Sequence, residues 1–402
     1  MCASAFVILA ASFSRLSPPD TAMTVINSIA DLRAIAQRRL PRALFEYIDR
    51  GSYDELTLAR NRDDLRALTL RQRVMVDVSK LSLATTVFGQ HWSMPMALAP
   101  TGLTGLFHRD GEIAAARAAH SAGVPFCLST MSICSIEDVR NEVDGTLWFQ
   151  LYVMRDRAFN ESMIARARAA RCEALVLTLD LPVQGIRRRD AKNGLAVPPR
   201  ITWRSAGDFL LRPRWLAGVM LGKRRTFGNL AAYFPKSGTT ALSEWVGSHL
   251  DNTLTWKDIA WVRDRWPGKL ILKGILDADD ARLAADTGVD ALVVSNHGGR
   301  QLDGATSTIA ALSRVADAAG GRCEIIMDGG ISSGQDVLKA LALGARACLI
   351  GRSFLYGLAA RGQPGVALAL QILSRELEVS MALTGARTIG DIGPTCLVNP
   401  SR

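Results

Sequence analysis

Eight short apolar runs alternate with alanine- and charge-rich stretches of helical period, and this alternation constrains the fold more than any other feature. Short buried strands that are each followed by a helix indicate parallel pairing, because a parallel connection needs a crossover. Eight such units predict an α/β fold, a closed (β/α)8 TIM barrel, as one domain. The expected strands are Met96–Pro100, Phe126–Thr130, Leu147–Tyr152, Ala174–Asp180, Leu270–Ile275, Ala291–His297, Glu324–Gly330 and Ala347–Arg352.

The first part of the chain stands apart from this pattern. Residues 1–22 are expected to be an extension or a start assigned too early, with Met23 opening the barrel region that runs to residue 402. A cleaved leader is the alternative, but no basic residue precedes the apolar stretch Ala3–Phe13, as a signal peptide requires. An N-terminal helical segment from Ser28 to Gly51 is expected before the first strand, with Pro41 opening its second helix.

An insertion of about residues 194–251 separates the fourth and fifth expected strands. The net charge is +10, and residues 187–225 hold eleven Lys or Arg against two Asp, a surplus of nine. Aromatic and aliphatic residues interleave with these cations, which suits a surface that binds anionic lipid. A lid over the active site and an oligomer contact are the alternatives. No recognised nucleic-acid-binding motif accompanies the patch, so a nucleic-acid partner is not expected.

The seven cysteines are scattered, odd in number and without a C-x-x-C pair. Several lie in apolar runs, which favours reduced buried thiols in a cytoplasmic setting over a disulfide framework. No metal site is expected.

Polar residues gather where the expected strands end, and active sites of such barrels lie at the carboxyl ends of the strands. A purely structural barrel has no need of polar groups that converge on one rim from all eight strands. The rim residues are Thr101, Gly102, Ser129, Gln150, Tyr152, Thr178, Asp180, Arg187, Lys273, His297, Arg300, Asp328, Gly330, Gly351 and Arg352.

The stretch Ser295–Asp303, which follows the sixth strand, joins a histidine and an arginine around two glycines. His297 can accept a proton near neutral pH, and Arg300 can hold a carboxylate with its two-pronged guanidinium. The alternative is a glycine turn with two surface polar residues. Farther on, Gly329-Gly330 precedes a helix that starts near Ser333, and Gly351-Arg352 adds backbone amides and a cation. Loops at these two places often bind phosphate.

Ser295–Asp303 resembles the signature of the FMN-dependent α-hydroxy-acid dehydrogenase and oxidase family. The resemblance covers the chain from about Met23 to Pro400. It is strongest to the bacterial membrane-associated L-lactate dehydrogenases, through residues 99–105, 148–153, 256–258 and 273–277.

The resemblance implies FMN-dependent oxidation of an L-2-hydroxy acid, with L-lactate favoured, to the 2-oxo acid. Electrons would pass to a quinone or similar acceptor, in a homo-oligomer that lies in the cytoplasm, peripheral on the inner membrane. The alternatives are a soluble oxidase of 2-hydroxy acids that makes hydrogen peroxide, a non-redox barrel isomerase or aldolase, and a non-catalytic flavin-binding protein.

The resemblance also implies roles for individual residues. His297 would be the base, oriented by Asp180, with Tyr152 on the substrate hydroxyl side and Lys273 at the flavin N1/O2 edge. Tyr47, Arg187 and Arg300 would hold the substrate carboxylate, although Tyr47 alone reads as a core aromatic. The residues expected at FMN are Thr101, Gly102, Ser129, Gln150, Thr178, Lys273, Ser295, Asp328, Gly330, Ser332, Gly351 and Arg352.

Three positions depart from the family pattern. Ser332 stands where many relatives carry an arginine that would approach the phosphate. Arg352 and backbone amides would therefore have to supply more of the contacts to the phosphate. Met131 stands where glycolate oxidase has a tryptophan, which would reshape the substrate side. Gly102 replaces the alanine of typical oxidases, which favours a dehydrogenase.

Overall fold

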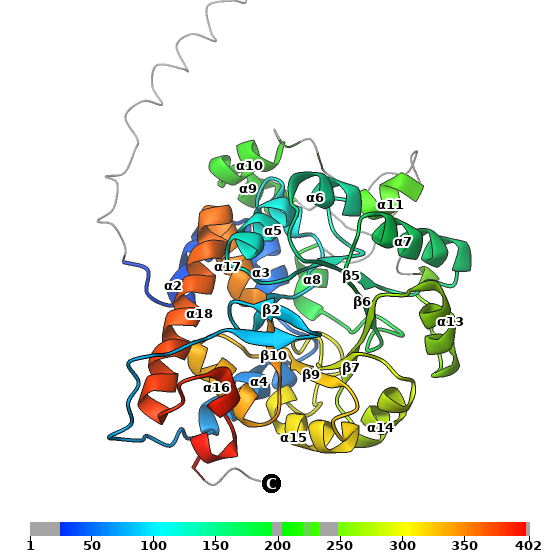
Figure 1. Cartoon of the computed structure of the whole chain (residues 1–402). Coiled ribbons are helices and arrows are strands. Elements are labelled where there is room, and N and C mark those ends of the chain that lie inside the picture. The colour runs from blue at the N-terminus through cyan, green and yellow to red at the C-terminus, as the bar shows by residue number, and fades with distance from the viewer. Residues whose placement is uncertain are drawn as a thin grey trace, which may run out of the picture.

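The computed structural model describes residues 25–398, apart from 195–202, 221, 223, 225 and 234–247. Residues 1–22 therefore lie outside the described part. A closed barrel of eight parallel strands forms the centre, with the strands in chain order and β10 paired to β3 (Figure 1). The predicted (β/α)8 barrel is confirmed. Its strands are β3 Met96–Leu98, β4 Phe126–Ser129, β5 Leu147–Leu151, β6 Ala174–Thr178, β7 Lys269–Ile275, β8 Ala291–Val294, β9 Glu324–Met327 and β10 Ala347–Ile350.

Several strands end earlier than predicted. The prediction ran β8 to His297, but the strand stops at Val294. His297, Gly298 and Gly299 have positive φ angles of 58°, 65° and 72°, so the backbone leaves the extended conformation there. The apolar run thus marks the strand, and the polar residues after it belong to the rim loops.

The outer layer consists of helices that lie around the barrel (Figure 1). Helix α7 starts at Arg157, because the Asp156 side chain accepts a hydrogen bond from the Phe159 amide and caps it. The helices of this layer are α5 Gly111–Ser121, α6 Ile136–Glu142, α7 Arg157–Ala169, α13 Lys257–Arg265, α14 Ala278–Asp286, α15 Thr308–Ala319, α16 Gly334–Ala342, α17 Arg352–Arg361 and α18 Gln363–Thr384.

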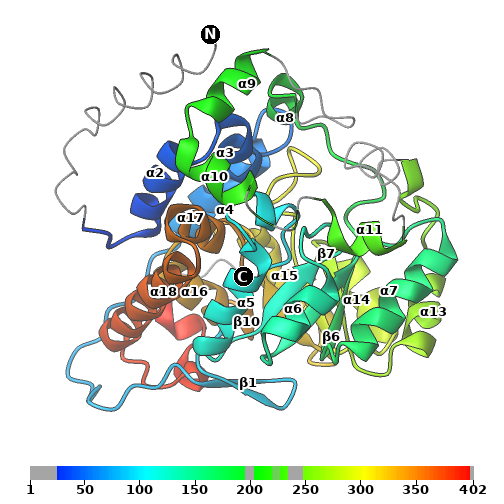
Figure 2. The same ribbon diagram turned by 90° about the horizontal axis from the view of Figure 1, so that it is seen from above.

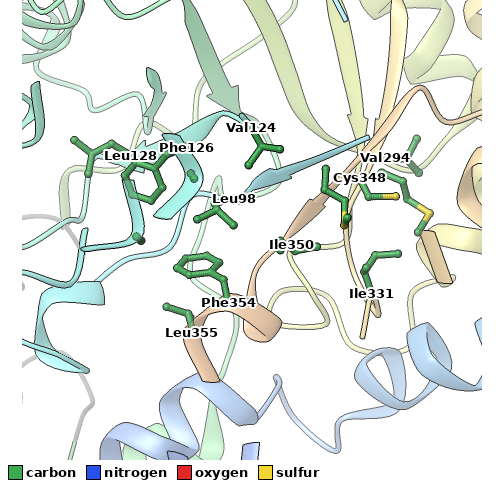
Figure 3. Packing of buried hydrophobic residues seen from close by; sticks show 14 of the residues in the cluster. Leu98, Val124, Phe126, Leu128, Val294, Ile331, Cys348, Ile350, Phe354 and Leu355 are labelled. Atoms are coloured by element: carbon green, nitrogen blue, oxygen red, sulfur yellow. The ribbon is translucent and has the colours of Figure 1, made fainter. Parts of the chain in front are cut away.

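Alternate strand residues face opposite sides of the barrel wall. One set packs outward against the helices, where Figure 3 shows Leu98 of β3, Leu128 of β4, Ile350 of β10 and Phe354 of α17 in one cluster. The other set fills the barrel interior. Its members include Ala97, Cys127, Trp148, Val176, Ile271, Val293, Ile326 and Leu349.

A hairpin that the sequence did not predict closes the amino end of the barrel. Strands β1 Thr85–Val87 and β2 Gln90–Trp92 pair antiparallel and precede β3 directly. The Trp92 ring lies 5.6 Å from that of Trp148 in the interior. The Phe88 amide donates to Glu324 at the start of β9. With this end sealed, ligands reach the barrel from its carboxyl end.

The N-terminal helical segment forms the predicted helices, α2 Ile29–Arg39 and α3 Arg42–Asp49, and a further helix, α4 Leu56–Ala67, follows. Helix α2 lies beside α17 and α18, so helices from early and late in the sequence pack together (Figure 1, Figure 2). The chain closes with the short turns η3 Ile389–Asp391 and η4 Pro394–Cys396.

Between β6 and β7 the described residues form α8 Arg188–Lys192, α9 Trp203–Leu210, α10 Pro213–Met220 and α11 Gly228–Tyr233. Helices α9 and α10 lie next to each other, and α9 packs on α3 (Figure 2). Lys223 and Arg225 of the basic patch lie outside the described residues. Within the part of the chain that the structure describes, no helix is long and apolar enough to cross a membrane.

Candidate active site

A cavity of about 750 Å³ lies at the carboxyl ends of the strands, within the range typical of cofactor and substrate sites. Three predicted site residues, Ser129, Asp180 and Ser295, stand behind its wall and bond to residues that line it. The predicted residues that line the cavity are Tyr47, Thr101, Gly102, Gln150, Tyr152, Thr178, Arg187, Lys273, His297, Arg300, Asp328, Gly330, Ser332, Gly351 and Arg352.

Strand geometry explains why polar groups from separate strands meet here. Side chains two residues apart on a strand face the same way, so the residue two positions beyond an interior apolar residue also faces the barrel axis. Interior Cys127, Trp148, Val176, Ile271, Val293 and Ile326 precede, in this order, Ser129, Gln150, Thr178, Lys273, Ser295 and Asp328. Cross-strand register adds to this, since Ser129 is level with Gln150 and Thr178 with Lys273.

His297 is held between a carboxylate and a phenol. Its Nδ1 lies 2.9 Å from Asp180 Oδ1, and its Nε2 lies 3.4 Å from the Tyr152 hydroxyl. The His297 amide donates to Ser295 Oγ at 3.1 Å, which fixes a left-handed backbone conformation that is uncommon for a non-glycine residue. Nδ1 thus faces Asp180, while Nε2 faces the cavity.

A glycine on the neighbouring strand makes room for Asp180. Gly274 interrupts the pairing of β7 with β8 and has a φ of 112°. A Cβ atom at this position would lie 2.7 Å from Asp180 Cβ and 2.8 Å from its Cγ. Any larger residue would therefore push the carboxylate away from His297.

Burial and the neighbouring charges set the protonation of this pair. Burial lowers the pKa of His297 below its ordinary value and outweighs the opposite pull of Asp180. Burial alone would raise the pKa of Asp180, but His297 and Lys273 together hold it below its ordinary value. At neutral pH the pair is thus a neutral imidazole beside a carboxylate, the state in which Nε2 can accept a proton.

Two arginines flank the Tyr47 ring, although the three residues come from distant segments. The guanidinium carbon lies 4.7 Å from the ring centroid for Arg300 and 6.0 Å for Arg187. Arg300 donates through Nη1 to the carbonyl oxygens of Tyr47 and Arg50, which lie at the carboxyl end of α3 and lack helical partners. Burial, with the like charge of Arg187, lowers the pKa of Arg300 to about 10, so Arg300 remains cationic at neutral pH.

Lys273 is another cation of the cavity wall. Its Nζ lies 2.8 Å from Asp328 Oδ2 and donates to Ser295 Oγ at 2.7 Å. Burial opposes its charge, but Asp328 and Asp180 raise its pKa above the ordinary value. Lys273 is therefore a fixed positive charge among the polar strand ends.

Three buried polar atoms of cavity-lining residues lack hydrogen-bond partners among the residues that the structure describes. They are Gln150 Nε2, Thr178 Oγ1 and Asp328 Oδ1. Buried polar groups are paired in nearly all native structures, so unpaired ones in a cavity point to a ligand. A flavin fits them, because one edge of its pyrimidine half alternates carbonyl oxygens with an N–H group and its ribityl chain carries hydroxyl groups.

Several cavity residues were not predicted from the sequence. Leu58 and Arg62 come from α4, which was not foreseen. The insertion was foreseen, but not the contacts that its residues make with the cavity, where Phe209, Trp215 and Val219 form an apolar roof. The Trp215 indole donates to the Leu106 carbonyl in η2 Thr104–Leu106 at 2.7 Å and fixes that roof.

The fold and the cavity together define a class of protein: a barrel enzyme that places a histidine, paired with a carboxylate, and two arginines in one cavity that suits a planar, polar cofactor. Residues 36–399 match the family model of FMN-dependent dehydrogenases. The chain belongs to this family, and it is an FMN-dependent oxidoreductase of 2-hydroxy acids.

Curated relatives and solved structures agree with this assignment. The chain is 48% identical over 380 residues to an L-lactate dehydrogenase of Caulobacter sp. (strain K31), covering 94% of this chain and 100% of the relative. It is 49% identical to an L-lactate dehydrogenase of Stenotrophomonas maltophilia (strain R551-3), covering 93% of this chain and 99% of the relative. The solved structure of monotopic membrane protein (S)-mandelate dehydrogenase is similar with a TM-score of 0.89 and 38% identity, covering 93% of this chain and 100% of that chain.

Proposed function

We propose that this chain oxidises L-lactate to pyruvate with bound FMN and passes the electrons to a quinone at a membrane surface. The observation that carries the proposal is His297, whose Nδ1 is backed by Asp180 and whose Nε2 faces the cavity that also holds Arg187 and Arg300. A base beside an anion clamp suits a substrate with a hydroxyl group next to a carboxylate. Family membership decides against the non-redox isomerase or aldolase, since those reactions need no flavin.

His297 accepts one proton from the CH–OH unit of the substrate at Nε2. The nearby Tyr152 hydroxyl stays protonated, because burial raises its pKa well above the ordinary value, and so it can donate to the substrate oxygen. Asp180 stabilises the imidazolium that forms. In this role the carboxylate of Asp180 stays ionised throughout.

Arg187 and Arg300 bind the carboxylate and fix which face of the α-carbon meets the cofactor. A guanidinium matches a carboxylate with two parallel hydrogen bonds. Arg300 is held by carbonyls at the carboxyl end of α3, and both arginines lie near the Tyr47 ring. The side chain of the substrate then meets Met131 and the roof formed by Phe209 and Trp215, which is apolar.

FMN, when bound, supplies the two-electron acceptor for this oxidation. Gln150 and Thr178 would hold its ring through atoms that lack partners among the described residues, and Asp328 would meet the ribityl chain. Ser129 orients Gln150 by donating to Oε1 at 3.0 Å. Lys273 would offset the negative charge that the ring gains on reduction. Thr101 and Gly102 line the same cavity from the loop after β3, and the segment from Asp328 to Arg352 would meet the ribityl chain and phosphate.

The surface next to the roof supports a membrane location. Leu210 and Leu211 at the end of α9 are 71% and 74% exposed, and Arg212 and Arg214 follow them directly. Exposed leucines beside cations suit the headgroup region of an anionic bilayer. The (S)-mandelate dehydrogenase with the similar fold is described as a monotopic membrane protein. We therefore place the enzyme on the cytoplasmic face of the inner membrane, near quinone.

A steady-state panel tests substrate and acceptor together. Purified holoenzyme is offered L-lactate, glycolate, (S)-mandelate and 2-hydroxybutyrate, each with a short-chain quinone analogue or with oxygen as the acceptor. The proposal expects the highest kcat/KM with L-lactate and the quinone analogue. Higher kcat/KM with mandelate would overturn the substrate, and equal or faster turnover with oxygen would indicate an oxidase.

Flotation with vesicles tests the membrane surface. Burying two leucines contributes about 3–6 kcal/mol, so Leu210→Ser with Leu211→Ser should weaken partitioning into anionic vesicles by on the order of 100-fold or more. The control pair is Val74→Ser with Met75→Ser, since both of these residues are exposed and apolar but lie far from the insertion in the sequence. Equal losses for the two pairs, or no loss for the leucines, would refute the assignment.

A further inference from the structure

Arg62 lines the cavity but makes no hydrogen bond or ion pair with any of the described residues. It lies on α4 and is half-buried. An arginine that loses solvent usually gains a carboxylate or carbonyl partner, because its desolvation is costly. A half-buried guanidinium that faces a cavity without a partner is suited to an anionic ligand.

The packing of α4 places Arg62 at one end of the cavity. The Asn61 side chain exchanges two hydrogen bonds with Asn296, at 2.9 and 2.7 Å, which locks α4 to the loop after β8. The Asn61 carbonyl oxygen would lie 2.3 Å from a Cβ atom on Gly330, so the helix packs directly on the loop after β9. Arg62 is therefore next to the segment that carries Gly330 and Ser332.

Helix α16, which follows this loop, has few free hydrogen-bond donors for an anion at its amino end. Asp336 Oδ2 already accepts from the amides of Ser332 and Ser333, both at 2.9 Å, and from Ser332 Oγ at 3.2 Å. The Gly334 amide donates to Glu376 Oε2 at 2.8 Å. The amino end of α16 thus has carboxylates of its own, and Ser332 brings no cation.

The amino end of the next helix, α17, differs from that of α16. Its first turn has no side-chain cap, so its amides remain available to an anion. Arg352 stands there, but three of its N–H groups donate to the carbonyls of Ile48, Arg50 and Gly298. Of the five N–H groups of an arginine, only two remain.

Arg62 and Arg352 are close enough for their charges to act on each other. Burial lowers the pKa of Arg352, and the charge of Arg62 adds to that effect. Asp49, the carboxylate that opposes this, is already bound by Arg33 at 2.6 and 2.7 Å and by the Tyr356 hydroxyl at 2.8 Å. Two like charges without a free carboxylate favour a ligand that carries more than one negative charge.

We propose that Arg62 binds the phosphate of FMN together with the start of α17 and Arg352, and so supplies the cation that Ser332 does not. The role is one of cofactor binding and selectivity. It depends on the family assignment and not on the substrate or acceptor proposed above.

Competition between FMN and riboflavin, which lacks the phosphate, tests this role without reference to turnover. Holoenzyme is equilibrated with mixtures of the two flavins, free flavin is removed, and the bound ratio is measured by chromatography. Arg62→Gln should lower the preference for FMN about tenfold, while Arg62→Lys should retain part of it. The control is Arg66→Gln, one turn along the same helix, since Arg66 is 76% exposed and pairs only with Asp63 at 3.5 Å.

A second substitution separates a lost phosphate contact from local damage. Ser332 is exposed at the cavity wall, so Ser332→Arg has room to restore a cation. Ser332→Arg should raise the FMN preference of the otherwise unchanged enzyme and rescue Arg62→Gln. A bound ratio within twofold of the unchanged enzyme in Arg62→Gln would overturn the proposal. So would an equal loss in Arg66→Gln, or the absence of any rescue.

Discussion

Replacing Asp180 by asparagine tests how much of the catalysis rests on the His297 pair. The change keeps the size of the side chain but removes the charge 2.9 Å from Nδ1. Two unit charges at this distance attract by about 5–6 kcal/mol at an effective dielectric constant of about 20. This value is an upper limit for the lost stabilisation, since the side-chain amide of the asparagine can still accept a hydrogen bond from Nδ1. Removing one member of a buried pair typically costs about 3–5 kcal/mol.

The attraction of Asp180 stabilises the imidazolium that forms as His297 takes the proton. Losing this attraction therefore raises the barrier of the oxidation. At about 1.4 kcal/mol per factor of ten, Asp180→Asn should slow flavin reduction by roughly 10²–10⁴-fold. KM should change little, because Arg187 and Arg300 are untouched. The assay is anaerobic stopped-flow bleaching of the flavin by L-lactate. Asp54→Asn, which breaks only an exposed pair with Arg188, is the control.

The pH profile gives a second readout with a definite sign. Activity requires neutral His297, so it should fall as the pH drops through the His297 pKa, which burial places below the ordinary value. Asp180 raises that pKa, so its removal should move the acid limb to still lower pH. The reasoning is refuted if Asp180→Asn keeps its FMN and reduces it within threefold of the unchanged rate, or if the acid limb moves upward.

Two further substitutions test the clamp and the fold. Arg300→Lys should raise KM for L-lactate about 10–100-fold with FMN retained, because a lysine cannot make the paired hydrogen bonds to a carboxylate; a change below threefold would remove Arg300 from the clamp. Gly330→Ala should lower the free energy of unfolding by about 2–4 kcal/mol, from overpacking against Asn61 and a φ of 84°. Gly288→Ala, with a φ of 71° and open space around it, isolates the backbone effect and should cost about 1 kcal/mol; equal losses in chemical denaturation would contradict the clash.

The barrel could be predicted because each unit carries its own local signal. An apolar run, a polar strand end and a helical period lie within about thirty residues, so β8 and its rim loop were found from residues 291–303 alone. The polar strand ends could be assigned to one rim for the same reason. His297 and Asp180, for example, are 117 positions apart, yet parallel strands bring their ends together.

Features that depend on distant packing were not predicted. Helix α4 reads as a polar surface helix, and only its contacts with Asn296 and Gly330, more than 230 residues away, show that Arg62 faces the cavity. Glu112 reads as a surface residue of α5, but it is buried, and its Oε1 accepts from the amides of Gly105 and Ile133, both at 2.9 Å. The roof residues lie on α9 and α10, whose apolar residues recur at helical period, but that pattern does not show which part of the barrel their apolar faces cover.

The central claim is that His297, on the loop after β8, is the base that oxidises a 2-hydroxy acid through bound FMN. Anaerobic mixing of L-lactate with the His297→Gln holoenzyme tests it most directly, with the flavin absorbance followed in a single turnover. The account predicts that the variant keeps its FMN, and that L-lactate reduces this flavin at least 10³-fold more slowly than in the unchanged enzyme. This factor corresponds to roughly 4 kcal/mol of lost proton-transfer catalysis. Reduction within tenfold of the unchanged rate would contradict it.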